Sequence, residues 1–472
     1  MKAAPLILIL LAASPAAAQQ PVTAFLPVPP STTPFLGGVP AGTATGDIVT
    51  ITVLDAIVRA LQHNLGVLMA EEGLGRAKGV RWQTLSELLP NVNARVSETR
   101  QKINLQAFGF GSPGGPSFPG VPDIVGPFNV FDARVSVSQS LVDLAALNDA
   151  RADAHKVEAA RLSSRSARDF VINVAGTLYV HALGSFARAE SARAQRQTAQ
   201  ALYDQALDLK KGGVIAGIDV LRAEVQLSSE TQRSTAATNE FEKAKLLLAR
   251  AIGLPLGQNF ALDANLPGLP TPDMTLEQAV EQAYKSRPDY QAALERVRAA
   301  EMTRRAVVGG GLPSVRVNAD YGEIGLSPSD SQATYAVAGV VTIPIFQGGR
   351  LRGRLLEADA DLRQRRAEAE DLKAAIYYEV RTAFLDLDAT SQQLQMGTRA
   401  RELAAQQLTQ ARDRFAAGVA SNIEVVQAQE AVAVANEQYI AALYGYDLAK
   451  GGLLKGMGTA EGTLRQLLGG AR

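Results

Sequence analysis

The chain has 472 residues, and its 47 lysines and arginines balance its 47 aspartates and glutamates, so the formal net charge is zero. This balance argues against nucleic acid as a partner, because proteins that bind nucleic acid usually carry a strongly basic surface. The chain contains no cysteine, which excludes disulfide bonds, thiolate metal ligands and a lipid-modified N-terminal cysteine.

The first 18 residues are typical of a secretory signal peptide. A lysine precedes the apolar run 6–11, and three alanines at 16–18 follow it, in the order that precedes a cleavage site. We expect residues 1–18 to be removed and residues 19–50 to be extended. The apolar run is too short to cross a bilayer, and no later stretch of 18 residues is apolar throughout, so we predict no transmembrane helix. An exported chain of this kind needs β-strands to enter a membrane.

The positions of the prolines divide the chain. Proline removes a backbone donor and clashes with the preceding helical turn, and all 22 prolines avoid residues 128–254 and 345–472. Both windows are rich in alanine, leucine, glutamine, arginine and glutamate, which favour helices, and a glycine turn interrupts each one. We therefore predict two pairs of a long and a shorter returning helix, at 142–211 with 218–251 and at 348–416 with 422–454.

A repeated pattern indicates two similar copies within the chain. A run of Gly-Val, small residues, Ile and an acid occurs at 213–219 and again 205 positions later, at 418–424. Residues 52–90 and 275–313 match at an offset of 223 positions, so the first copy contains 18 additional residues. We assign the copies to residues 51–253 and 275–457, with a linker at 254–274 and a tail at 458–472.

Between the helices of each copy, the apolar residues follow a period of two. Val92, Ala94 and Val96 alternate with polar residues, and the same alternation returns in residues 131–138 and 315–321. The pattern predicts β-hairpins within residues 90–142 and 312–346, whose strands have one apolar and one wet face.

Four such strands must belong to a closed sheet if they cross a membrane, because the edge groups of an open sheet find no partner in lipid. Two chains would supply eight strands, and three chains would supply twelve, which is wide enough for a channel. The alternative is a water-soluble protein in which each hairpin packs on its own helices. Three arginines on one strand face, Arg95, Arg134 and Arg316, favour the closed sheet with a water-filled lumen.

The order of these segments resembles that of the TolC-like outer-membrane efflux proteins. The resemblance rests on the signal peptide, the two copies, the LPxV entries at 89–92 and 312–315, and the hairpin exits VSQSLVD at 137–143 and TIPIFQGGR at 342–350. It implies a mainly α fold with transmembrane β: a homotrimer whose twelve-stranded barrel is continued by a long α-helical barrel, with two tandem repeats per chain.

The resemblance also implies a function. The protein would be an outer-membrane channel of a Gram-negative bacterium, extending into the periplasm as the passive exit duct of a tripartite efflux pump. Its partners would be two further copies of the chain, a periplasmic adaptor protein that opens the duct, an inner-membrane pump and outer-membrane lipid. Two alternatives stay open: the exit duct of a type I protein secretion system, and a periplasmic helical stalk without a pore.

The glycine turns have a purely structural interpretation. Positive φ angles that end a helix are expected at three glycines, Gly212, Gly213 and Gly418. Ser421 and Glu424 form an S-x-x-E capping box, and Asp219 lies in a first helical turn, where the helix dipole favours an acid. Helix capping alone would explain all of these residues.

The resemblance adds a functional interpretation of the same turns. It places them at the periplasmic tip, where the duct closes, and it implies a gate that contains Asp219, Phe415, Glu424 and Gln427. It also implies that the adaptor docks on the turns, at Gly213, Val214, Gly418 and Val419. The chain departs from the family pattern at Ala420, where an arginine is common, and at Gln427, where a second acid is common. Apolar packing around Phe415 is therefore an alternative lock.

The sequence shows no pattern typical of an enzyme. The three histidines, His63, His155 and His181, are far apart, and no further ligands cluster near His155 and Glu158, which share a helical face. The glycine-rich segments at 73–79 and 309–313 lack the spacing of a nucleotide-binding loop. We expect no catalytic site, no metal and no cofactor.

Overall fold

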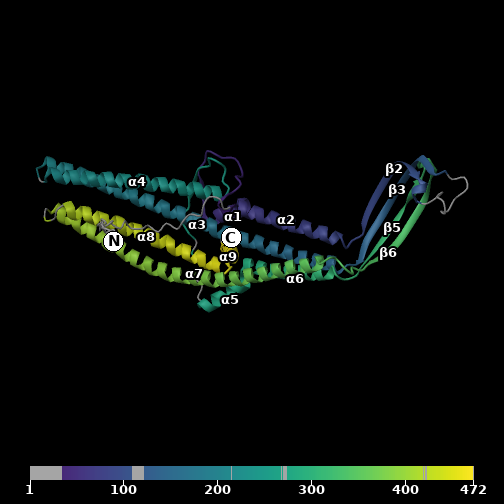
Figure 1. Cartoon of the computed structure of the whole chain (residues 1–472). Coiled ribbons are helices and arrows are strands. Elements are labelled where there is room, and N and C mark those ends of the chain that lie inside the picture. The colour runs from purple at the N-terminus through teal and green to yellow at the C-terminus, as the bar shows by residue number, and fades with distance from the viewer. Residues whose placement is uncertain are drawn as a thin grey trace, which may run out of the picture.

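The computed structural model describes residues 34–108, 122–213, 215–266, 268, 274–417, 419 and 422–470. The expected signal peptide at 1–18 lies outside the described residues. The molecule is long and thin, with a β-sheet at one end, paired helices at the other and additional short helices near its middle (Figure 1).

Helices and strands follow each other in the same order in the two halves of the chain. The first half contains β1 (Val49–Ile51), α1 (Val53–His63), α2 (Leu65–Ser86), β2 (Asn91–Asn104), β3 (Ile124–Val142), α3 (Leu144–Lys211) and α4 (Gly217–Ala251). The second half contains β4 (Phe260–Leu262), α5 (Leu276–Ser286), α6 (Pro288–Gly309), β5 (Ser314–Gly325), β6 (Ser331–Thr342), α7 (Arg350–Ala416) and α8 (Asn422–Gly456), followed by α9 (Ala460–Gly470). Short 3-10 turns lie at Pro34–Leu36, Leu105–Phe108 and Pro328–Asp330.

The two longest helices, α3 with 68 residues and α7 with 67, run through most of the helical part. Alanine recurs among the buried residues of α3, at positions such as Ala152, Ala175 and Ala182. Small side chains on the buried side let neighbouring helices approach closely, and the absence of proline keeps the backbone hydrogen bonds of both helices uninterrupted.

Near the middle of the molecule, two clusters of buried apolar residues hold the helices together. One joins α1, α3, α4 and α9 around Tyr179 and Leu248, and the other joins α5, α7 and α8 around Ile376 and Leu453. The hydroxyl of Tyr179 donates to the backbone oxygens of Ile51 and Asp263, each at 2.8 Å. The short parallel pair β1–β4 is thereby fixed to α3.

One stretch of α3 is long and apolar enough to span a membrane by length and composition, although the sequence has no uninterrupted apolar run there. Within this stretch, 56% of the residues are buried inside the protein. Composition alone is weak support for a membrane span, because the buried core helix of a soluble protein has the same properties.

The sheet at the other end has the antiparallel order β2-β3-β5-β6. Its register aligns Val92 with Val137 and Val137 with Ala319, so apolar residues of neighbouring strands share one face. The other face is polar: Arg134 binds Asp132 at 2.8 Å on its own strand and Asp320 at 2.5 Å on the next. The sheet therefore separates an apolar face from a charged one, as the alternation in the sequence predicts.

The apolar face of the sheet is not covered by any other part of the described chain. Val96 and Val337 are 73% and 71% exposed, and Tyr335 is 78% exposed. Both outer strands, β2 and β6, have one edge that pairs with no strand among the described residues. The helices do not fold back over the sheet (Figure 1), so within the described residues the hairpins do not pack on their own helices, as the alternative to a closed sheet expected.

Candidate functional site: the tips of the helical hairpins

The first tip, between α3 and α4, is built on one glycine with a left-handed backbone. Gly213 has φ +72°, a value that residues with a Cβ rarely adopt. Gly212 was expected to have a positive φ as well, but it has φ −76° and still belongs to the right-handed end of α3. A single left-handed residue is sufficient to end the helix. Val214 lies outside the described residues.

Asp219 lies in the first turn of α4, as expected, and is paired within that helix. Its carboxylate binds Arg222 at 3.1 Å, and no side chain caps α4 at Ala216. On the other side of the turn, Ile215 packs against a small buried cluster that contains Ala206 of α3 and Val220 of α4. The first tip therefore has an apolar inner side and a half-exposed acid–base pair outside it.

The second tip, between α7 and α8, places its acid in the same way. Glu424 lies in the first turn of α8, and its carboxylate is 3.7 Å from Arg414 at the end of α7. Gln427 and Val419 are exposed, Val419 to 68%. Ser421 of the expected capping box lies outside the described residues, as do Gly418 and Ala420.

Phe415 contributes to an apolar contact between the two hairpins. It packs with Val425 and Ala428 of α8, and Leu202 of α3 joins the same cluster. Asp219 and Glu424, by contrast, pair within their own hairpins. Among the residues expected at the gate, Phe415 therefore belongs to a contact between the hairpins.

An ion pair that the sequence did not predict also joins the hairpins. Arg233 of α4 binds both carboxylate oxygens of Glu430 of α8, at 2.9 and 2.8 Å, and one oxygen of Glu230 at 3.0 Å. Helices α4 and α8 touch each other in few other places. The repeat could not reveal this pair, because the residue 205 positions before Glu430 is Val225.

Glu230 is the most buried member of this group, with 3% of its surface exposed. Burial raises the pKa of its carboxyl group, although Arg233 opposes the shift. One of its carboxylate oxygens has no hydrogen-bond partner among the described residues. A crevice of about 410 Å³ lies beside it, lined also by Gln429 of α8 and by Arg401, whose guanidinium lies 3.9 Å from the ring centre of Tyr439.

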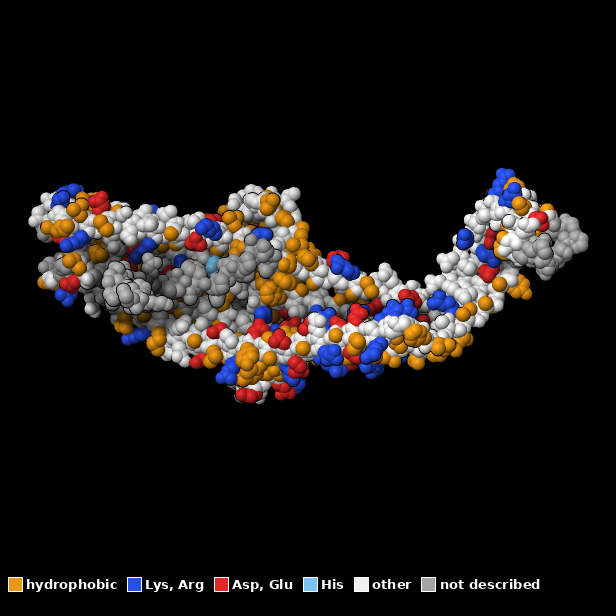
Figure 2. Space-filling view, viewed as in Figure 1, with side chains coloured by type: hydrophobic (Ala, Val, Ile, Leu, Met, Phe, Trp, Pro, Cys, Tyr) orange, Lys and Arg blue, Asp and Glu red, His pale blue; other side chains and the backbone are white. Residues whose placement is uncertain are grey.

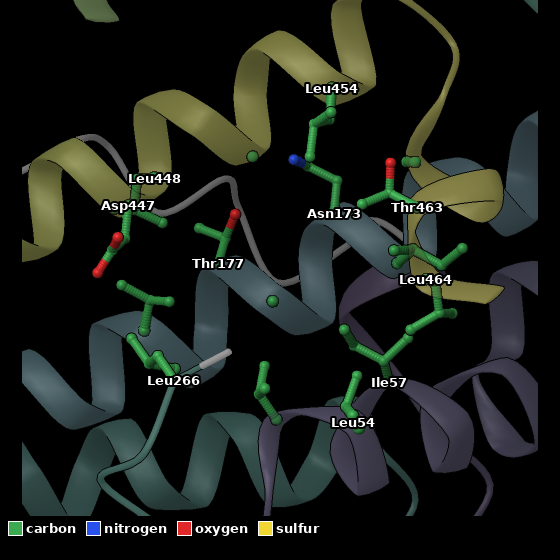
Figure 3. Close-up of a pocket in the computed structure, with 16 residues that line it drawn as sticks. Leu54, Ile57, Asn173, Thr177, Leu266, Asp447, Leu448, Leu454, Thr463 and Leu464 are labelled. Atoms are coloured by element: carbon green, nitrogen blue, oxygen red, sulfur yellow. The ribbon is translucent and has the colours of Figure 1, made fainter. Parts of the chain in front are cut away.

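A second cavity, of about 110 Å³, lies near the middle of the molecule, between α1, α3, α8 and α9. Figure 3 shows Leu54, Ile57 and Leu464 on one side of it, and on the other side Asn173 and Asp447 beside Leu454 and Leu448. Burial raises the pKa of the Asp447 carboxyl. The cavity is remote from both tips and from the sheet.

The histidine singled out in the sequence has a partner that the sequence could not show. His155 of α3 lies 2.7 Å from Glu295 of α6, whereas Glu158 pairs with Arg161 in its own helix. No group of three or more histidine, aspartate or glutamate side chains within the described residues is placed to hold a metal ion.

Comparison with known families gives one match. Residues 279–459, which run from α5 to just before α9, match the model of the family described as outer membrane efflux protein. A comparison of the sequence with curated proteins gives no match.

Solved structures of similar fold cover most of the chain. The outer membrane channel CmeC of Campylobacter jejuni has a TM-score of 0.77 at 17% identity, over 89% of this chain and 89% of that one. The outer membrane protein VceC of Vibrio cholerae has a TM-score of 0.74 at 18% identity, over 86% and 96%. The open state of the MtrE channel of Neisseria gonorrhoeae has a TM-score of 0.72 at 18% identity, and the match covers 86% of this chain and 88% of that one. The resemblance that the sequence shows to outer-membrane efflux proteins is thus confirmed.

Proposed function

We propose that this chain, a member of the outer membrane efflux protein family through the domain at residues 279–459, is the exit duct of a tripartite efflux pump in the outer membrane of a Gram-negative bacterium. Three copies would join their sheets into a twelve-stranded barrel and their helices into a tunnel through the periplasm. The division into two repeats, residues 51–253 and 275–457, belongs to this proposal, because three chains with two similar halves make a nearly round tube.

The observation that carries the proposal is the uncovered amphipathic sheet. A sheet in lipid must have no open edges, because an unpaired backbone donor or acceptor costs several kcal/mol there. The four strands of one chain leave the outer edges of β2 and β6 open, and four strands are too few to close on themselves. Pairing β6 of one copy with β2 of the next closes the ring, places the exposed valines towards lipid, and turns Arg134 and its aspartates towards a wet lumen.

The helical tips would form the closed end of the duct. In a trimer, Asp219 and Glu424 bring six carboxylates to one opening, with Phe415 and Gln427 beside them. Such a ring of acids favours the passage of cations over anions. The absence of an arginine at Ala420 leaves the closed state to other contacts, for which the Phe415 cluster and the pair Arg233–Glu430 are the candidates.

The partners follow from the same proposal. A periplasmic adaptor protein would dock on the two turns, at Gly213, Val214, Gly418 and Val419, and an inner-membrane pump would supply the energy, since we propose a passive duct rather than an enzyme. The exit duct of a type I protein secretion system has the same architectural needs and is the second candidate. A stalk without a pore is disfavoured by the exposed apolar face of the sheet, which a periplasmic rod does not need.

Engineered disulfides between copies test the closed barrel. The chain has no cysteine, so each introduced pair is the only one present. Asn93→Cys on β2 is combined in turn with Ala336→Cys or Ala338→Cys on β6, all on the polar face. Within one chain these strands are three strand spacings apart, about 14 Å, which is too far for a disulfide. Oxidation should therefore give covalent dimers and trimers.

The matched control is the pair Asn93→Cys with Ser136→Cys, which are direct partners on β2 and β3 and should form a disulfide within the monomer. If the control oxidises while a scan of β6 positions gives only monomers, the edges of β2 and β6 do not meet and the barrel is wrong.

A further inference from the structure

The segment that joins the sheet to α7 has an unusual surface. It contains Ile343, Ile345 and Phe346, which are 61%, 94% and 88% exposed. On β6, Tyr335, Val337 and Val341 form the outward apolar row of the sheet. Alternate residues of a strand lie on the same face, and Ile343 and Ile345 follow Val341 at this spacing of two. They therefore continue the apolar row beyond the last strand residue, Thr342.

Basic side chains follow this apolar segment directly. Arg350, Arg352 and Arg354 lie in the first five residues of α7, and all three are exposed. Among the described residues, none of the three has a carboxylate within ion-pair distance; Glu357 forms no such pair, and Asp359 binds Arg304 instead. The first turn of α7 contains no acid. Figure 2 shows apolar and basic side chains side by side where the helices meet the sheet.

We propose that this segment and these arginines, residues 343–354, form a collar that binds anionic phospholipid in the periplasmic leaflet of the membrane. The inference rests on the proposed function, in which the apolar face of the sheet meets lipid. Thr342 then marks the edge of the hydrocarbon region. From Arg350 to Arg354 the helix rises by about 6 Å, so the three arginines span a length comparable to the depth of one headgroup layer.

The chemistry of the collar fits a phospholipid better than it fits a second copy of the chain. Exposed isoleucine and phenylalanine beside arginine match a molecule that combines acyl chains with a phosphate. Guanidinium groups bind phosphate oxygens in a bidentate manner. A second copy seated here would have to supply carboxylates at the same level, and covering the collar would remove it from lipid.

Lipid selectivity measured with spin-labelled lipids tests the collar. The purified full-length protein is placed in phosphatidylethanolamine vesicles with spin-labelled phosphatidylglycerol or phosphatidylcholine, and the fraction of motionally restricted label is recorded. A basic residue near a charged membrane surface changes binding by about fivefold. Averaged over all lipids that touch the barrel, the wild type should prefer phosphatidylglycerol by at least about twofold.

The variant Arg350→Gln/Arg354→Gln should lose this preference. Arg350→Lys/Arg354→Lys, which keeps both charges, should retain most of it. The matched control is Arg363→Gln/Arg381→Gln, which removes two exposed arginines of the same helix that form no ion pair with the part of the chain that the structure describes. The nearer one lies about 20 Å beyond Arg350. The control should behave like the wild type.

Three results would overturn the collar: no preference in the wild type, an equal loss in both Gln variants, or dissociation of the oligomer in Arg350→Gln/Arg354→Gln alone, which would make the collar a contact between copies. Conductance in the same membranes separates this inference from the proposed function. Ion-conducting steps without lipid preference would contradict the proposed collar and support the proposed channel. The absence of steps would contradict the proposed channel itself.

Discussion

The guanidinium of Arg287 donates a hydrogen bond of 3.2 Å to the carbonyl oxygen of Gly456, across 169 residues of the chain. The same group binds Asp289 and Glu379, each at 2.6 Å. In the other half of the chain, the side-chain amide of Asn64 donates to the carbonyl of Ala251 at 3.2 Å. Asn64 precedes Arg287 by 223 positions and Ala251 precedes Gly456 by 205, so the two halves tie the end of the returning helix to the same helix junction.

Replacing Arg287 by methionine should destabilise the protein strongly. Burial alone would lower the pKa of Arg287, yet its pKa is raised because Asp289 and Glu379 hold its charge. Its removal leaves Asp289 without its cation and Glu379 with Lys455 alone, both partly buried, at a cost of about 3 kcal/mol. The melting temperature followed by helical circular dichroism should fall by several degrees. The control Lys285→Ala, which breaks an exposed pair with Glu281, should melt like the wild type. Equal decreases of the melting temperature in both variants would show that Arg287 contributes no more than an exposed ion pair.

Alanine at Arg233 or Glu430 should weaken the closed state of the tips. Both changes remove the ion pair between α4 and α8, but Arg233→Ala also leaves the buried Glu230 without a cation, so its effect should be larger. Each variant should raise the single-channel conductance above that of the wild type, and the double variant should add little to Arg233→Ala, because the two residues act through one contact. Additive increases, or no increase, would show that the pair does not hold the hairpins together.

The attachment of α9 to α3 should be tighter in mild acid. Burial, together with the nearby carboxylate of Glu461, raises the pKa of Asp169 to about 6, while the Glu461 backbone N–H, which donates to it at 3.2 Å, opposes the shift. An acid whose folded pKa is raised adds stability that is fully present below its unfolded value and is lost as the pH rises through the folded one. The window is therefore about pH 4 to 6.

Hydrogen exchange of the Thr463 and Leu464 amides measures this effect. After correction for intrinsic rates, protection should be several-fold higher at pH 5 than at pH 7.5, and Asp169→Asn should remove most of the difference. Arg165 and Arg168 of α3, Glu71 of α2 and Asp289 of α6 remain unchanged in this variant. Unaltered pH dependence in Asp169→Asn would assign the effect to one of the other titratable groups, Glu461 included.

Two helical glycines should respond in opposite ways to alanine. Gly176 lies inside α3 beside the middle cavity, with open space where a Cβ would be, so Gly176→Ala should stabilise the helix by up to about 1 kcal/mol. At Gly66, a Cβ would collide with the ring of Phe35, so Gly66→Ala should destabilise by about 1–3 kcal/mol. Thermal melts of the two variants should shift to opposite sides of the wild type. A shift of both to the same side would contradict this packing.

Local patterns in the sequence were sufficient to predict most of the elements. The predicted helix at 142–211 is observed as Leu144–Lys211, and the one at 348–416 as Arg350–Ala416, because proline and glycine act on their own neighbourhood. The alternation in β2, β3 and β5 predicted which side chains share a face, since strand geometry fixes the period. Gly212 was mispredicted, because adjacent glycines do not reveal which of them takes the left-handed angle.

Contacts between distant elements could not be predicted in the same way. Arg233 and Glu430 meet only because α4 and α8 become neighbours, and nothing in either sequence window indicates this. The same holds for Arg287 and Glu379, which belong to different helices. Periodicity shows which face of a helix is apolar, but not which helix covers it. The roles of Asp219 and Glu424 at a gate depend on further copies of the chain and stay a prediction.

The most direct test of the central claim is the single-channel conductance of the purified oligomer in a planar bilayer, with wild type beside Asp219→Ala/Glu424→Ala. A duct that closes at its tips predicts small steps that favour cations, and a loss of this preference in the double variant. Conductance steps with the same ion selectivity in both proteins would show that Asp219 and Glu424 act only in stabilising the helix turns. A protein of trimeric mass that gives no steps, in either form, would contradict the channel.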